Sequence, residues 1–446
     1  MSLLNRGHVF ICAEPESPVQ MQTNYSPYLS QRTLRVIVSL IGILACLLAI
    51  WMTAQAGFSR LLGKYATLEA SLPAADRAIA LAPSSSESHR VRAAVLYHLK
   101  QLPDAARELE LAVSLRPRHD YLWLELAIIR DELGDSAGAL AAFNESVRRA
   151  PHYAYPRWQR GNFLLRLGRF DQAFADLRYA AASNPDLIPS LIDLAWGISK
   201  RDTQVTVQLA HITTSKMRAA FAGFLARKGR AKEAREQFEL ADAVSELTRR
   251  ELVRHLISAN AFKEAFEVWK KKGNSEAAER RPAAIYDGGF EGPLTFDEFG
   301  FGWRVSRASQ SVRLAADSSQ FHSGSKSLLI EFLGDSSPDS SLVSQLILVE
   351  PSSRYRLNFA ARTQDVVTGG LPLAIVSDAA GVFKRLGESA PLRQDTTNWQ
   401  VSSFDFRTES GTNAVTLSIQ RKNCSTSPCP IFGSIWMDSF SIEELK

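Results

Sequence analysis

The chain lacks the short motifs that common catalytic sites leave in a sequence. It contains no HExxH zinc motif, no GxSxG nucleophile elbow, no Walker phosphate loop and no GxGxxG after an expected strand. Its 8 histidines are dispersed, and none pairs with another at metal-ligand spacing on a helix. His322 stands beside Ser323 and Ser325, but neighbouring side chains on a strand or turn point apart. We therefore expect a protein that is not an enzyme.

Clusters of like charge are also missing. The formal net charge is +5 and the sequence pI is about 9.0, yet basic residues alternate with acidic ones along the chain. A nucleic-acid-binding surface needs clustered Lys and Arg. The sequence therefore predicts no nucleic-acid partner.

One long apolar run stands near the amino terminus. Residues 36–54 read VIVSLIGILACLLAIWMTA without a charge, and a helix of about 20 such residues crosses the ~30 Å hydrocarbon core of a bilayer. Arg32 and Arg35 precede the run, which favours a cytoplasmic amino terminus. We expect a tail at 1–32, a transmembrane helix at 33–55 and an exported remainder. This corresponds to a single-pass protein of the inner (plasma) membrane whose bulk is periplasmic.

Other interpretations of this region stay open. Ala54, Ala56 and Gly57 are small residues that would suit signal-peptide cleavage, and a buried core helix has similar composition. Cys46 would be the lipid-attachment residue of a lipoprotein, but the apolar run continues past it. Met21 is an alternative start.

Cysteine is scarce, and its placement is informative. Of the 4 cysteines, Cys12 precedes the apolar run and Cys46 lies inside it. Cys424 and Cys429 are the only pair in the part expected to be exported, and the CSTSPC spacing can close a small loop. We predict a disulfide between them.

Proline recurs at a fixed period of 34 residues, at Pro83, Pro117, Pro151 and Pro185. Twelve positions before three of these prolines stands an alanine: Ala105, Ala139 and Ala173. A small residue in phase with a turn glycine, as at Gly134 and Gly168, indicates helical hairpins that cross closely.

These segments resemble tetratricopeptide repeats. The third unit matches best, through Trp123, Leu126, Gly134, Ala139, Phe143 and Pro151, and the resemblance extends over 56–275. Fainter units are indicated by Gly229, Ala234, Phe238 and Ala241, and by Ala265 and Trp269. The resemblance implies a concave groove that binds a protein partner, lined by Arg90, Tyr97, Tyr121, Tyr155, Trp158 and Asn162.

The helical pattern ends near Pro282, and we place a linker at 276–285. Beyond it, turns separate short alternating segments at 326–332, 355–362, 371–377, 399–406, 414–421 and 434–442. These predict an antiparallel sandwich over 286–446. The expected fold class is multidomain: a transmembrane helix, an all-α helical-repeat solenoid and an all-β jelly roll.

The last region resembles the galactose-binding-like jelly roll of carbohydrate-binding modules. The resemblance rests on DGGFE at 287–291, HSGSKSL at 322–328 and IWMDSFSI at 435–442. It implies a carbohydrate site with aromatic and polar side chains, for which the candidates are Trp303, Arg362, Gln364, Phe383 and Trp399, with Trp436 as a further ring. It also implies a structural calcium near Glu291 and Asp438.

Together these features predict a non-catalytic, membrane-anchored scaffold. Its repeat arm would bind protein and its sandwich would bind glycan, in assembly or export of a cell-surface polysaccharide. Two alternatives remain: a glycan hydrolase using acids such as Glu291, Asp297 and Glu298, and a purely structural interaction module.

Overall fold

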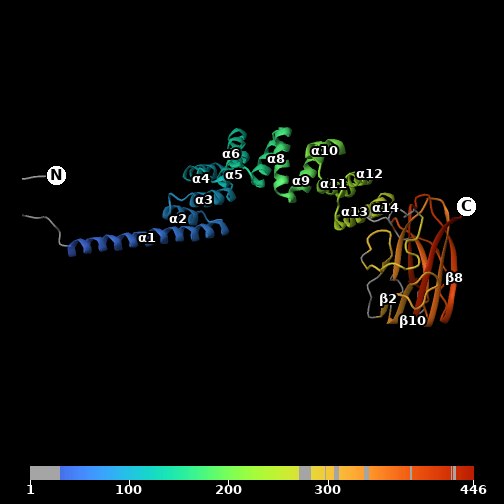
Figure 1. Ribbon diagram of the computed structural model, residues 1–446. Coiled ribbons are helices and arrows are strands. Elements are labelled where there is room, and N and C mark those ends of the chain that lie inside the picture. The colour runs from blue at the N-terminus through green and yellow to red at the C-terminus, as the bar shows by residue number, and fades with distance from the viewer. Residues whose placement is uncertain are drawn as a thin grey trace, which may run out of the picture. The chain divides into compact units, whose positions relative to one another are not determined.

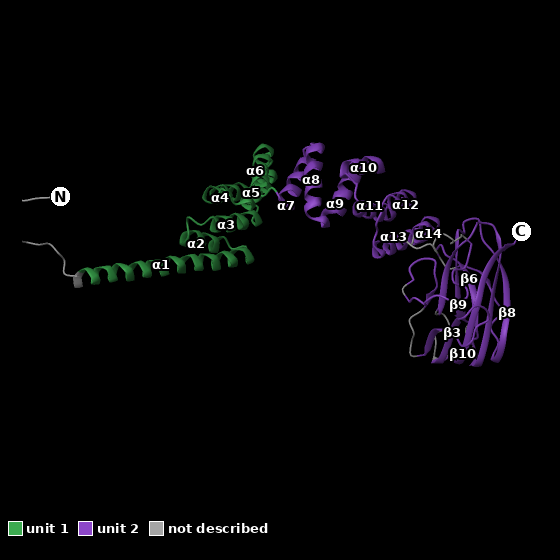
Figure 2. Cartoon of the chain, viewed as in Figure 1, with its two compact units in different colours: residues 1–151 green, residues 152–446 purple. Residues whose placement is uncertain are grey.

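The computed structural model describes residues 31–270, 283–296, 298–305, 311–335, 341–381, 384–422, 424 and 428–445. The chain divides into two compact units, Met1–Pro151 and His152–Lys446 (Figure 2). The first is helical, and the second combines helical hairpins with a β-sandwich (Figure 1). The helical-repeat array and the jelly-roll sandwich predicted from the sequence are both present.

Helix α1, Gln31–Leu68, is continuous from the apolar run into the repeats. Among the described residues it is the one helix long and apolar enough to cross a membrane, by length and composition. Its carboxyl-terminal end packs on α2, Leu72–Leu81, where the Ser59 hydroxyl donates to the Ala78 carbonyl at 2.7 Å. The expected limit at 55/56 thus falls inside one helix, and the domain limits remain a prediction.

Two further hairpins complete the first unit. Helix α3, Ser86–His98, pairs with α4, Leu102–Leu115, and α5, Asp120–Glu132, pairs with α6, Ser136–Arg149. Ala105 and Ala139 are fully buried, as the close crossing requires. Gly134 has φ +80° and Asp135 caps α6, accepting from the Gly138 N–H. The predicted hairpin turn is confirmed.

The helices of the second unit are α7 (Ala154–Arg166), α8 (Phe170–Ser183), the 3-10 turn η1 (Pro185–Leu187), α9 (Ile188–Ile198), α10 (Thr203–Ala210), α11 (Ser215–Arg227), α12 (Ala231–Glu239), α13 (Glu246–Ser258) and α14 (Phe262–Lys270). Ala234 and Ala265 are fully buried, which confirms the two faint units. The sequence signals did not single out the α9–α10 pair, although Ile188, Leu191, Ile192, Ala195 and Trp196 form one buried stripe along α9.

The sandwich consists of two antiparallel sheets of five strands. One has the order β1-β4-β9-β6-β7 and the other β2-β3-β10-β5-β8. The strands are β1 (Arg304–Val305), β2 (Val312–Asp317), β3 (Ser327–Asp335), β4 (Val343–Leu348), β5 (Arg354–Thr368), β6 (Pro372–Asp378), β7 (Arg385–Glu388), β8 (Asp395–Arg407), β9 (Ala414–Arg421) and β10 (Pro430–Leu445). Each of the six predicted segments lies on an observed strand, whereas β1, β2, β4 and β7 were not predicted.

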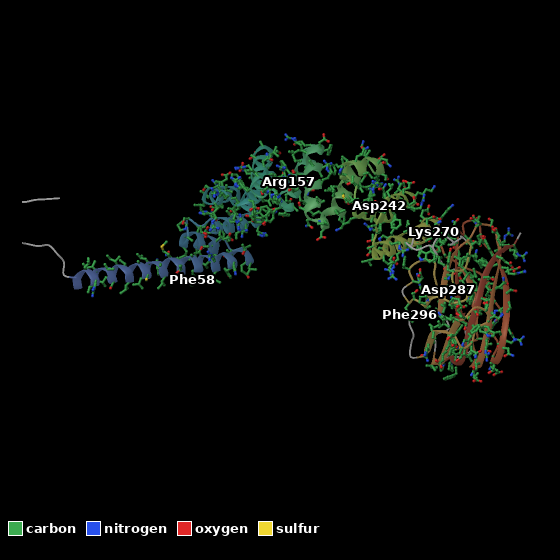
Figure 3. The ribbon with its side chains drawn as sticks, viewed as in Figure 1. Phe58, Arg157, Asp242, Lys270, Asp287 and Phe296 are labelled. Carbon is green, nitrogen blue, oxygen red and sulfur yellow. A yellow bond between two sulfur atoms is a disulfide. The ribbon has the colours of Figure 1, made fainter. Side chains whose placement is uncertain are left out.

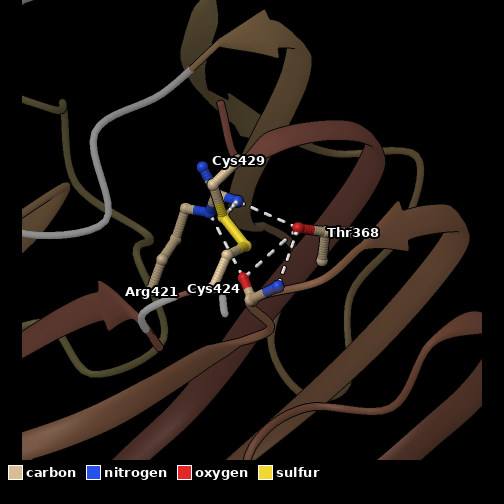
Figure 4. Close-up of a disulfide and its surroundings, with 5 residues drawn as sticks. Thr368, Arg421, Cys424 and Cys429 are labelled. Carbon is tan, nitrogen blue, oxygen red and sulfur yellow. Dashed lines mark hydrogen bonds between the residues drawn. A yellow bond between two sulfur atoms is a disulfide. The ribbon is translucent and has the colours of Figure 1, made fainter. Parts of the chain in front are cut away.

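A disulfide joins Cys424 and Cys429, whose Cα atoms are 5.8 Å apart. Arg421, which is buried, donates from Nη2 to the Thr368 hydroxyl at 2.9 Å and to Cys429 Sγ at 3.0 Å (Figure 4). Arg421 therefore ties the disulfide of the β9–β10 connection to Thr368 at the end of β5.

The last helix shares a hydrophobic core with the sandwich. Phe266 contacts Phe301 edge to face, with ring centroids 5.1 Å apart, and Trp269 contacts Tyr286 at the same distance. The Trp269 indole donates to Glu298 Oε1 at 2.9 Å, and a Cβ on Gly300 would stand 2.2 Å from the Trp269 ring. The sandwich is thus packed against α14.

Candidate functional site: the outer face of the sandwich

One face of the β2-β3-β10-β5-β8 sheet points away from the sandwich core, and we call it the outer face. Side chains alternate between the two faces of a strand. On β10, Ile435 and Met437 belong to the core cluster, so Trp436 between them lies on the outer face. On β8, Phe406 is in the core and Phe404 packs against it, which places Trp399 on the outer face as well.

An arginine lies beside Trp436 on this face. Arg362 of β5 is the register partner of Trp436, with its guanidinium carbon 5.7 Å from the ring centroid. Arg362 also donates from Nη1 to Gln320 Oε1 at 2.7 Å. The Trp436 indole donates to Asp317 Oδ2 at 2.6 Å. Trp436 is only 7% exposed, so its ring is covered by neighbouring side chains and serves to support Arg362.

Trp399 is the half-buried aromatic of the same face. Its ring centroid lies 5.7 Å from that of His322, with the planes tilted by 54°. His322 Nδ1 is 2.9 Å from the Ser439 hydroxyl. The Trp399 ring is therefore held at one edge and keeps part of its surface open to solvent.

Two carboxylates hold the loop that carries His322. Asp438 Oδ2 accepts from the backbone N–H of His322 at 2.7 Å and of Ser323 at 2.9 Å. Glu291 accepts from the Ser325 N–H at 2.7 Å and from its hydroxyl at 2.6 Å. Hydrogen bonds from Ser325, the side chain first, lower the pKa of Glu291. This arrangement, which we call the loop clamp, positions His322 against Trp399.

A second, apolar part of the outer face lies near the start of β10. Phe432 pairs across the strands with Leu333 of β3 and Val367 of β5, and all three are at least half exposed. Gly433 follows at a β-bulge with φ +103°, where a Cβ would stand 2.4 Å from the Asp365 carbonyl oxygen. Gln364 and Ser434, a register pair, separate this apolar part from the Trp436 row.

The predicted carbohydrate residues have different surroundings. Arg362, Gln364 and Trp399 lie on the outer face. Trp303 lies in the core instead: it is 6% exposed, stacks on Phe290 with centroids 4.9 Å apart and donates to the Asp287 carbonyl. Its ring is therefore covered by protein, and it does not belong to a surface platform. Phe383 lies outside the described residues.

Phe432 and Gln320 were missed at the sequence level. The alternation along 430–445 would have placed Phe432 opposite the core. Gln320 precedes β3 in a loop without periodicity, and no pattern in the sequence relates it to Arg362.

Calcium remains an untested prediction. Glu291 and Asp438 do lie near each other on either side of Gly289. A Cβ atom added to Gly289 would stand 3.8 Å from Glu291 Oε1 and 3.6 Å from Asp438 Oδ1. However, backbone N–H donors engage both carboxylates. The described residues hold no group of three or more His, Cys, Asp and Glu suited to a metal. Calcium requires six to eight oxygen ligands, and the two carboxylates would supply at most four of them.

The acids proposed for hydrolysis serve structural contacts. Glu298 accepts from the Trp269 indole and from the Gly300 N–H at 2.8 Å, while Glu291 belongs to the loop clamp. Asp297 lies outside the described residues. The arrangement of Glu291 and Glu298 is therefore that of two separate hydrogen-bond anchors.

In the first unit, Arg90 and Tyr97 of the predicted groove line one cavity of about 290 Å³ between α3 and α5. Its apolar wall includes Ile128 and Ile129. Arg90 donates to Glu125 Oε1 at 3.1 Å, and burial raises the pKa of Glu125. The second oxygen of Glu125 is buried without a hydrogen-bond partner among the described residues. Tyr121, also on α5, is exposed.

In the second unit, Trp158 and Asn162 line another cavity, of about 640 Å³, together with residues of α9 and α11. Asn162 donates to the Trp158 carbonyl at 2.9 Å, and Trp158 is half-buried. Tyr155, one turn earlier on α7, is exposed. The predicted groove residues thus occur in two separately described cavities and on exposed helix faces.

No protein-family model matches the chain. Protein FlbA of Caulobacter vibrioides is 31% identical over 101 residues, which make up 23% of this chain and 17% of FlbA. The matched part is thus less than a fifth of FlbA's length.

Several solved structures are similar over single regions. YrrB, described as a TPR protein with an unusual peptide-binding site, is 18% identical, with 35% of this chain and 82% of YrrB covered and a TM-score of 0.30. A CBM4 structure is 14% identical, covering 36% of this chain and 99% of its own, with a TM-score of 0.28. TmCBM61 in complex with beta-1,4-galactotriose is 19% identical, covering 37% and 100%, with a TM-score of 0.25. Scores this low support no argument about function.

Proposed function

We propose that this chain is a non-catalytic, membrane-anchored scaffold whose sandwich binds carbohydrate across its outer face. The observation that carries the proposal is the row formed by Trp399, Arg362 and the supporting Trp436. A sugar ring presents a C–H face that stacks on an aromatic plane and hydroxyls that need donors and acceptors. Trp399 offers the plane, and Arg362 and Gln320 offer donors and acceptors beside it.

The shape of the outer face favours a chain-like saccharide. Phe432 and Trp436 are four residues apart on β10, which at about 3.3 Å per residue corresponds to roughly 13 Å. Gln364 and Ser434 lie between them. A glycan of several units would therefore contact apolar, polar and aromatic side chains in turn.

The test is affinity electrophoresis of the full chain in detergent through gels that contain soluble polysaccharides. The full chain is required because α14 and the sandwich share a core. An aromatic contact contributes about 0.5–1.5 kcal/mol beyond its buried area, and 1.4 kcal/mol corresponds to a tenfold change in affinity. Trp399→Ala should therefore weaken retention about tenfold. Tyr153→Ala is the matched control, because Tyr153 is an exposed aromatic of the repeat array. Failure of the parent chain to bind any polysaccharide tested would reject the carbohydrate role.

The helical-repeat array would bind a protein partner. The cavity between α3 and α5 supports this, because an apolar wall beside the unpaired oxygen of Glu125 suits a cationic side chain on an otherwise apolar peptide. In the second unit, the cavity beside Trp158 provides a further aromatic contact.

Helix α1 would anchor both modules to the inner membrane, with the bulk of the chain in the periplasm. A protein-binding and a glycan-binding module on one anchor suit the assembly or export of a cell-surface polysaccharide. The Cys424–Cys429 disulfide supports an oxidising compartment.

A further inference from the structure

The part of α1 that extends beyond the apolar run carries an apolar stripe with no partner among the described residues. Upstream of Ala54, the proposed membrane span would place the exposed apolar side chains in lipid. Downstream, Phe58, Leu61, Tyr65 and Leu68 remain 63%, 62%, 55% and 83% exposed. Phe58 is labelled on α1 in Figure 3. These four residues, which we call the α1 stripe, are more apolar surface than a solvated helix face normally presents.

The spacing of the α1 stripe is that of a coiled-coil seam. Its members follow one another at intervals of three, four and three residues, the a and d positions of a heptad. The other exposed residues between Gly57 and Leu68 are Arg60, Lys64 and Thr67, which are polar. Upstream, residues 36–54 are apolar at nearly every position, so the same register can be extended through Ile37, Leu40, Leu44, Leu47, Trp51 and Ala54 but is not distinguished there. A 3.5-residue spacing of apolar residues suits a partner helix that supercoils around α1.

The opposite side of α1 is already occupied. Ser59, Gly63 and Ala66 are buried against α2 and α3, and a Cβ on Gly63 would stand 3.3 Å from Val91. The α1 stripe therefore lies at the open end of the repeat array, where a solenoid ordinarily carries a polar capping surface.

Charge complementarity identifies the occupant. With Phe58 and Tyr65 at a, Lys64 stands at position g and Glu69 at position e of the next heptad. In a parallel coiled coil, g of one helix faces that e position of the other. The Glu69 N–H donates to the Tyr65 carbonyl at 3.0 Å, an i to i−4 bond, so the helical hydrogen-bond pattern of α1 extends to Glu69. Two copies of this chain would form the Lys64–Glu69 pair twice.

We infer that α1 forms a parallel coiled-coil dimer with α1 of a second copy of this chain. The inference rests on the proposed membrane anchoring, and on neither glycan nor partner binding. Because every copy inserts in the same direction and to the same depth, a spanning α1 brings two stripes together parallel and in register. Left-handed packing of this kind is also the common geometry between membrane helices.

Cysteine crosslinking of the full chain in cell membranes tests the inference. In a background with Cys12→Ser and Cys46→Ser, single substitutions Leu61→Cys and Tyr65→Cys should give disulfide-linked dimers under mild oxidation. Positions a and d of paired helices come within the Cα separation of about 4.4–6.8 Å that a disulfide needs. Arg60→Cys and Thr67→Cys, at position c, are the matched controls and should crosslink at least fivefold less.

A charge exchange provides a second readout. Lys64→Glu in the Leu61→Cys background should lower the crosslinking rate roughly two- to fivefold, as expected for an exposed ion pair. The double change Lys64→Glu with Glu69→Lys should restore it, which a merely folding-related effect of Lys64→Glu would not do.

Equal crosslinking at all four positions would indicate random collision and overturn the inference. The inference would also be overturned if no crosslinked dimer formed in chains that resist alkaline extraction from the membrane. That result would assign the α1 stripe to lipid headgroups or to a different protein. Extraction of the chain by alkali would instead reject the membrane anchoring itself, and with it the geometric basis of the dimer.

Discussion

At the scale of single residues, Glu291 makes a testable contribution to stability. Its carboxylate accepts hydrogen bonds from Ser325 and Lys326, which lower its pKa. A depressed pKa in the folded state contributes stability above the unfolded value of about 4.3, and that contribution is lost as pH falls through the folded value. Glu291→Gln should therefore lower the melting temperature at neutral pH and flatten its decline between about pH 5 and 3.

Thermal unfolding at a series of pH values measures this effect. Glu350→Gln is the control, because Glu350 is an exposed acid of the sandwich that lies outside the loop clamp. The same Glu291 variant should bind polysaccharide more weakly, since the loop clamp holds His322 against Trp399. Unchanged melting of Glu291→Gln across this range would contradict the role given to the clamp.

At the scale of elements, Trp269 of α14 links the repeat array to the sandwich. It is buried, contacts Tyr286 and Phe301, and donates to Glu298. Replacing a buried Trp by Ala costs about 3–5 kcal/mol. Trp269→Ala should therefore lower stability by an amount of this order, and the unfolding of helix and of strand should cease to coincide.

Far-ultraviolet circular dichroism, followed at wavelengths dominated by helix and by strand, detects that separation. The control Phe170→Ala removes a half-exposed aromatic at the start of α8 and should leave the two transitions together. A single unchanged transition in Trp269→Ala would show that other contacts suffice to couple the two parts.

At the scale of the whole molecule, the prediction concerns topology. If α1 crosses the inner membrane with its amino terminus in the cytoplasm, a periplasm-dependent reporter such as alkaline phosphatase should be active when fused after Lys446. The same reporter fused before Met1 should be inactive. The reverse pattern would refute the periplasmic assignment, and with it the surface-polysaccharide role.

How much could be predicted depended on whether the signal was local. Ala105, Ala139 and Gly134 indicated the hairpins because each repeat imposes the same steric demand at the same interval. Alternation indicated strands such as 414–421. Strand β4, Val343–Leu348, was missed because the buried polar Gln345 breaks its alternation and residues 346–348 are continuously apolar, and β7 is only four residues long.

The site was less predictable for the same reason. Trp399 and Arg362 were named as aromatic and polar candidates, but nothing local distinguished half-buried Trp399 from buried Trp303. Trp303 is buried because it lies in the core between the two sheets, whereas Trp399 lies on the outer face of one sheet. His322 approaches this face from a loop that Asp438, 116 residues away in the chain, holds at the His322 N–H.

The amino-acid sequence by itself determined the apolar helix, the 34-residue repeat and the strand segments, because periodicity and composition are properties of neighbouring residues. Only the tertiary structure decided which aromatic rings are covered, where Arg362 points and which side of α1 stays open. Those features depend on contacts between distant segments, and burial is defined by what the rest of the chain covers.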